Sequence, residues 1–168
     1  MAPWKVVVVT LFYCVMDACT AQRRNKALFP SAVRVKRGMA SMVNPTFHNS
    51  IQDVNLLFEI LLAGLQFGGE AGPFSLPDAE LASLRQTRKL EVICEDVIPR
   101  KLTEVRRLTS DLSSHLGHLR PEDFERTVLT MVYTAQRISN STSGHQREVW
   151  AESFVSLFQA IKQDLTPE

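Results

Sequence analysis

One tetrapeptide near the start of the chain has the residue types and spacing of a protease substrate. Arg34-Val35-Lys36-Arg37 has the Arg-x-Lys-Arg form after which proprotein convertases cut. Gly38 and the small residues that follow it fit the exposure that such a cut requires. We therefore expect cleavage after Arg37. The alternative is an uncut basic tail that contacts anionic surfaces such as glycosaminoglycans.

Three other groups of polar residues have some features of an active or metal site, and none has the required pattern. His115 and His118 have the spacing of two metal ligands on a helix, but no third ligand lies close in sequence. The acids of residues 122–125 are ordinary partners for the positive end of a helix. Ser143 and His145 lack a Gly-x-Ser-x-Gly turn. The sequence therefore predicts no catalytic residue, no metal, no cofactor and no enzymatic activity.

Two residues are candidates for covalent modification. Cys94 is left alone if Cys14 and Cys19 are removed with a signal, and an odd cysteine in a secreted chain predicts an intermolecular disulfide or a buried free thiol. The apolar neighbours of Cys94 favour the buried thiol. Asn140-Ser141-Thr142 is an N-glycosylation sequon in a polar stretch that predicts an exposed loop, and we expect Asn140 to carry a glycan.

Residues 1–21 have the pattern of a cleaved export signal. Lys5 precedes an almost unbroken apolar run from Val6 to Met16, which is shorter than the roughly 20 residues that span a bilayer. Small residues at Cys19 and Ala21 predict cleavage after Ala21, with cleavage after Thr20 as the weaker option. No later stretch is apolar enough to predict a membrane span, so we expect a secreted, extracellular protein.

Charge divides the rest of the chain at the predicted convertase site. Residues 22–37 carry six basic residues and no acid, a net charge of +6. Residues 38–168 carry 12 basic and 17 acidic residues, a net charge of −5. We therefore divide the chain into a signal peptide at 1–21, a basic, flexible arm or propeptide at 22–37, and one domain at 38–168. A basic arm and an acidic body would attract each other weakly, and salt would screen the attraction.

The pattern of the domain predicts an all-α fold, a compact, bundle-like arrangement of four to five helices. The first helix follows Ser50, which with Asp53 predicts an N-terminal cap, and it ends at Gly68-Gly69. Its apolar residues predict a central helix that buries one face, and they are Ile51, Val54, Leu57, Phe58, Leu61, Leu62 and Leu65.

Further helices are predicted from Pro77 to Val97 with a break near Arg88, from Thr103 to Ser114, from Pro121 to about Ile138, and from His145 to Leu165. Residues 68–77 are predicted to form a loop, and no strand is predicted. Two of these helices have well-defined apolar faces that we expect to point inward. They comprise Phe124, Val128, Met131, Val132, Ala135 and Ile138, and then Val149, Trp150, Phe154, Leu157, Phe158, Ile161 and Leu165.

Several stretches resemble a small family of secreted vertebrate proteins named as family with sequence similarity 180. The most specific stretch is Asp123-Phe124-Glu125-Arg126-Thr127-Val128-Leu129-Thr130. Shorter ones include Leu28-Phe29-Pro30, Glu80-Leu81-Ala82-Ser83-Leu84-Arg85 and Ser156-Leu157-Phe158-Gln159-Ala160. The resemblance implies secretion, and it brings no assigned activity, catalytic residue or ligand.

Taken together, these features predict a secreted, non-enzymatic helical protein that is matured by cleavage after Arg37 and acts as an extracellular signalling or protein-interaction factor. Its partner would be an extracellular protein or receptor, with no nucleic acid and no membrane span, and the protein would be a monomer or a Cys94-linked dimer. The alternative is a secreted protein of the matrix that keeps its basic arm and makes a weak contact with heparan sulfate.

Overall fold

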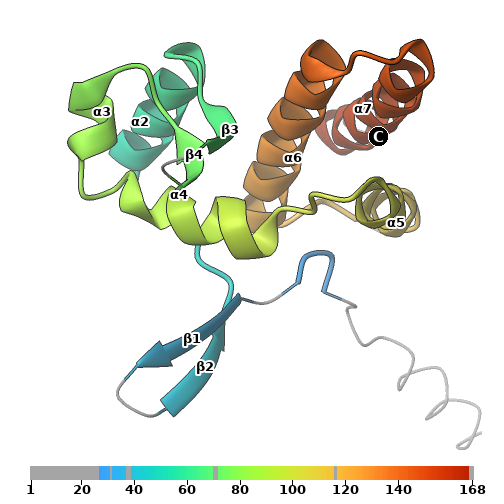
Figure 1. Cartoon of the computed structure of the whole chain (residues 1–168). Helices are drawn as coiled ribbons and strands as arrows, with labels where there is room; N and C mark the ends of the chain where they lie inside the picture. Colours follow the sequence, from blue (N-terminus) through green and yellow to red (C-terminus); the bar gives the residue numbers. More distant parts are fainter. Residues whose placement is uncertain (1–26, 31, 37–38, 70–71, 116, 167–168) are drawn as a thin grey trace, which may run out of the picture.

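The computed structural model describes residues 27–30, 32–36, 39–69, 72–115 and 117–166. Helices dominate this part of the chain, as predicted (Figure 1). They are α2 (Ile51–Leu62), α3 (Ala79–Ser83), α4 (Arg88–Val92), the π-helical turn η1 (Ile93–Val97), α5 (Leu102–Ser113), α6 (Pro121–Asn140) and α7 (Gly144–Leu165). The predicted signal at 1–21 lies outside the described residues.

Two antiparallel hairpins interrupt the helical pattern, so the prediction that there would be no strands is wrong. The first pairs β1 (Ala32–Lys36) with β2 (Met39–Val43) and projects away from the helices (Figure 1). The second pairs β3 (Gln66–Gly69) with β4 (Gly72–Ser75), inside the predicted loop. These strands are only four or five residues long, and β3 and β4 together contain three glycines. Their sequences therefore lack the sustained alternation of apolar and polar residues that predicts a strand.

Helix α2 begins where the sequence predicts and ends earlier. The Ser50 hydroxyl accepts a hydrogen bond from the Asp53 N–H at 3.2 Å, which confirms the predicted cap. The last residue of the helix is Leu62. Gly64 then takes a φ of +90°, the left-handed conformation in which a glycine has no steric penalty. Gly68 and Gly69 belong to β3 and do not end the helix.

The predicted break in the second helix is confirmed. The chain forms α3, leaves helical geometry at Leu84, and resumes helix at Arg88. The Asp78 carboxylate caps α3 by accepting hydrogen bonds from the Glu80 and Leu81 N–H groups at 2.8 and 3.1 Å. After η1 the chain turns at Ile98 and Pro99, so Pro99 ends this part as expected.

The core lies where α4, η1, α5, α6 and α7 meet, and α7 packs against both α5 and α6. Two edge-to-face aromatic contacts connect three elements through this core. The ring of Tyr133 on α6 lies 5.5 Å from that of Phe67 on β3 and 6.0 Å from that of Trp150 on α7. The core therefore fixes the β3–β4 hairpin, and with it the end of α2, to the long C-terminal helices. None of the described helices combines the length and apolarity that crossing a bilayer requires.

Candidate functional site

The feature that most suggests a function is an exposed apolar stripe on α2. Ile51, Val54, Phe58 and Leu62 are 69, 45, 63 and 71 % exposed. Their spacing places them on one side of the helix. We call these four residues the α2 outer face. The prediction that they point inward is wrong, and contiguous large apolar side chains on a surface are typical of a protein-interaction site.

A second set of apolar residues on α2 supplies the buried side. Ile60 is fully buried, and Leu56, Leu57 and Leu61 pack partly buried against the core. Helix α2 is thus apolar on two sides, so the sequence pattern alone did not distinguish the inner side from the outer one.

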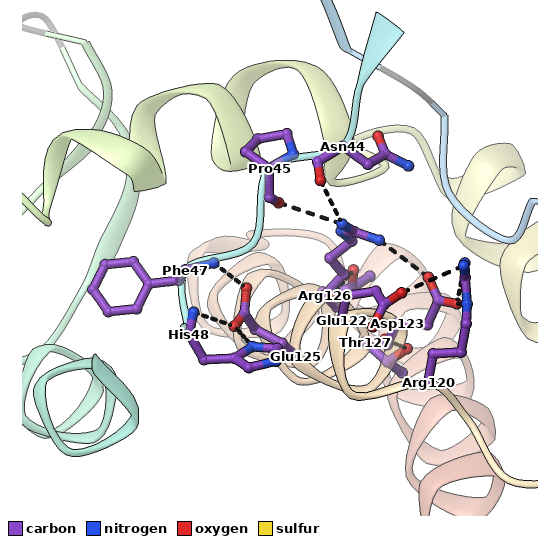
Figure 2. A network of polar contacts seen from close by, with 11 residues as sticks. Asn44, Pro45, Phe47, His48, Arg120, Glu122, Asp123, Glu125, Arg126 and Thr127 are labelled. Carbon is purple, nitrogen blue, oxygen red and sulfur yellow. Dashed lines mark hydrogen bonds and ion pairs between the residues drawn. The ribbon is translucent and has the colours of Figure 1, made fainter. Parts of the chain in front are cut away.

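Glu125 on α6 holds the chain just before α2 (Figure 2). One carboxylate oxygen accepts the Phe47 N–H at 2.8 Å, and the other accepts the His48 N–H at 3.0 Å. The second oxygen also contacts Nδ1 of His48. Because the Glu125 carboxylate is buried and accepts two backbone hydrogen bonds, it positions the start of α2.

Gln136, also on α6, holds the chain just after α2. Its side-chain oxygen accepts the Phe67 N–H, and its side-chain nitrogen donates to the Leu65 carbonyl, both at 2.8 Å. The two polar side chains of α6 thereby hold the segments on either side of α2 and help to orient the helix.

Arg126 forms the centre of a second buried polar group that begins one residue after Glu125. Its guanidinium is 1 % exposed and donates to Asp123 at 3.1 Å. It also donates to the carbonyls of Asn44 and Pro45 at 3.2 and 3.3 Å (Figure 2). Arg120 bonds the other oxygen of Asp123, and this hydrogen bond raises the pKa of Arg120. The segment that joins the first hairpin to α2 is therefore attached to α6.

The inner face of α6 is more polar than predicted. The apolar residues expected to face inward are only half-buried, whereas Thr127, Thr130 and Thr134 are fully buried. Each threonine hydroxyl donates to a carbonyl of the preceding turn, at 2.7 to 2.8 Å. Because this bond satisfies the hydroxyl, the threonine methyl can face the core, and the sequence pattern did not reveal this.

Helix α7 carries a smaller exposed set. Trp150, Leu157 and Ile161 are buried as predicted, but Phe158 and Leu165 are 46 and 65 % exposed, so the prediction for these two is wrong. With the exposed Val155 they form a patch that Lys162 interrupts. Because this patch is also apolar and exposed, its residues provide matched control substitutions for those of the α2 outer face.

The predicted convertase site lies at the first hairpin. Arg34 and Lys36 belong to β1, whose register with β2 pairs Lys36 with Met39. Arg37 and Gly38 lie outside the described residues. Just upstream, Phe29 is 2 % exposed, and its ring lies 5.9 Å from the Arg126 guanidinium carbon. Part of the arm that was expected to be flexible is thus packed into the core.

The predicted modification sites differ in accessibility. Asn140 is exposed, at the last turn of α6 and not in a loop as expected, and Ser141 leaves helical geometry. Cys94 is a free, fully buried thiol, and burial raises its pKa to about 12, against a smaller opposing effect of Arg100. The burial favours the free thiol over the disulfide, because an oxidised partner cannot reach Cys94 without local opening.

His115 and His118 are exposed and lie in the connection between α5 and α6. His118 is 83 % exposed and contacts Asp164 on α7. Over the described ranges, no cluster of three or more histidine, cysteine or acidic residues has the geometry to hold a metal ion.

Comparison with known proteins agrees with the resemblance noted in the sequence. The FAM180 family model matches residues 28–165. Protein FAM180B of Homo sapiens is 30 % identical over 112 residues, which cover 66 % of this chain and 61 % of that protein. No solved structure matches the fold. Because the family match covers the helical body, both exposed patches and Phe29, we conclude that the chain belongs to the FAM180 family.

Proposed function

We propose that the protein is a secreted, non-enzymatic factor that binds an extracellular protein through the α2 outer face. The observation that carries this proposal is the exposure of four large apolar side chains on a helix whose ends are both fixed by α6. A rigid helix with anchors at this spacing suits the helix-in-groove mode of recognition. The exposed Glu59, three residues before Leu62, lies at the flank of this face, so a groove with an apolar floor and a basic residue at one edge would complement it.

Maturation by cleavage after Arg37 is part of the proposal, and an intact-mass measurement tests it. The protein is secreted from transfected cells with and without a convertase inhibitor, its glycans are removed, and its N-terminus is sequenced. We expect a start at Gly38 that changes to Gln22 with the inhibitor. Arg37→Ala should reproduce the effect of the inhibitor, and the matched control Arg24→Ala should keep the start at Gly38. A start at Gln22 under both conditions would contradict cleavage.

Binding to cells tests the interaction itself. The labelled, secreted protein is titrated onto a panel of cultured cell types, with unlabelled protein as competitor. We expect saturable binding that the competitor abolishes on at least one cell type. Binding that stays linear with concentration on all of them would contradict the proposal.

The second candidate function is a matrix protein that keeps its basic arm. The burial of Phe29 favours it, because a packed residue holds the arm to the body. If this alternative is correct, the uncut 22–168 form elutes from heparin resin only at high salt, since each contact with a sulfate group is lost as salt rises. Elution at low salt would remove its support.

A further inference from the structure

The chain holds part of its own N-terminal arm in its core. Phe29 is 2 % exposed and belongs to the main apolar cluster, and the neighbouring Leu28 is half-buried. If the chain is cut after Arg37, both residues belong to the released peptide. The cut would therefore either pull an aromatic side chain out of the core or leave the peptide in place.

The wall that contacts Phe29 belongs to the body and does not depend on the cut. The Arg126 guanidinium faces the Phe29 ring, and all three groups that fix this guanidinium lie after Gly38. They are the Asp123 carboxylate and the carbonyls of Asn44 and Pro45. A preformed guanidinium over an aromatic ring is a favourable and orienting contact.

The pairing of β1 with β2 is a second contact between the arm and the body. β1 and β2 pair over five residues, from Ala32 with Val43 to Lys36 with Met39, and cleavage leaves one strand on each product. An isolated two-stranded pairing is marginal in water. The strands alone would therefore not hold the peptide, and the buried Phe29 decides whether it stays.

Charge is distributed unequally between the arm and the body. A cavity of about 670 Å³ lies beside residues 27–30, and its other walls come from η1, α5 and the turn between them. Four acidic and three basic side chains line it, so its local excess of charge is small. The larger contrast is between the arm, at +6, and the body, at −5. Salt should weaken the contact without abolishing it.

We propose that the site around Phe29 is a peptide-binding site, and that the N-terminal arm remains bound in it without a covalent link after cleavage. A separate arm peptide exists in cells only if the chain is cut after Arg37, so this proposal rests on the proposed cleavage. The binding itself is a property of the folded chain and can be measured with any protease.

The test uses the secreted full chain with Arg37→Ala, which removes the convertase site, and with a recognition sequence for a viral protease inserted after residue 37. After cleavage, the protein is passed through a size-exclusion column and its mass is measured. We expect the peptide to co-elute with the body. A body that emerges without the peptide would overturn the proposal. Because this cut does not use a convertase, failure of convertase processing in cells is a separate result.

Exchange then identifies the residue that holds the peptide, without altering the body. Labelled synthetic peptide 22–37 is added to the cut protein, and its incorporation is followed. The same peptide with Phe29→Ala should bind about a hundredfold more weakly, as expected for deleting a buried phenylalanine. The control peptide with Ala27→Ser, which changes an exposed residue, should keep its affinity within a few fold. Equal affinity of the Phe29→Ala and control peptides would overturn the assignment of the site.

Discussion

Glu125 and Gln136 lie eleven residues apart on α6 and bind the backbone just before and just after α2. Eleven residues make about three helical turns, so the two side chains share one face and lie about 16 Å apart. The 12 residues of α2 span about 18 Å, which matches this distance. One helix therefore holds another by its two ends and leaves the α2 outer face open.

Replacement of Gln136 by leucine should destabilise the protein by about 2 kcal/mol, because the Phe67 N–H and the Leu65 carbonyl lose their partner. Urea unfolding followed by circular dichroism gives this free energy. The control Gln159→Leu changes an exposed residue of α7 and should cost less than about 0.5 kcal/mol. Equal stability of the two variants would show that Gln136 does not hold α2.

Replacement of Arg126 by lysine should cost about 2 kcal/mol, because one ammonium group cannot reach a carboxylate and two carbonyls together. The matched control is Arg120→Lys, which changes a side chain that is 61 % exposed and bonds the same aspartate. It should cost less than about 0.5 kcal/mol in the same urea experiment. A smaller loss for Arg126→Lys than for Arg120→Lys would contradict the network in Figure 2.

Cys94 should make stability fall at alkaline pH. Its pKa of about 12 in the folded state lies above the usual 9.0, so the folded chain keeps a proton that the unfolded chain loses. The contribution is complete below pH 9 and is lost as pH rises from 9 toward 12. The difference in unfolding free energy between the wild type and Cys94→Ala should therefore shrink by about 1 kcal/mol from pH 8 to 10. A constant difference would contradict the burial of the thiol.

Asn140 should carry an N-glycan on the secreted protein, because its side chain is exposed where α6 ends. Thr142→Ala should lower the mass by one glycan and leave the unfolding temperature within a few degrees, since Thr142 is exposed. Digestion with a peptide glycosidase should then have no further effect on the variant. A wild-type mass that the enzyme does not change would refute the prediction.

The sequence predicted the elements whose signals are local. The Ser50 cap, the break before α4 and the starts of α5, α6 and α7 depend on residues within a few positions of each other, and all agree with the structure within two residues. Pro121 at the first position of α6 is one such signal.

The orientation of α2 depends on contacts that are distant in sequence, and the pattern did not predict it. The helix has apolar residues on two sides, and Glu125, 78 residues from Phe47, helps to decide between them. The local sequence indicates only that Glu125 is a partner for the end of its own helix. The role of Arg126 cannot be predicted from the sequence either, because its acceptors, the carbonyls of Asn44 and Pro45, lie more than 80 residues away.

Affinity measurements on the cells that bind the wild type show whether the partner binds through the α2 outer face. A Phe58→Ser, Leu62→Ser double variant is compared with a Phe158→Ser, Leu165→Ser double variant. All four side chains are exposed, so both variants should fold equally well. We expect the α2 variant to bind at least about a hundredfold more weakly than the wild type and the α7 variant to stay within a few fold. Unchanged affinity of the α2 variant would contradict binding through the α2 outer face.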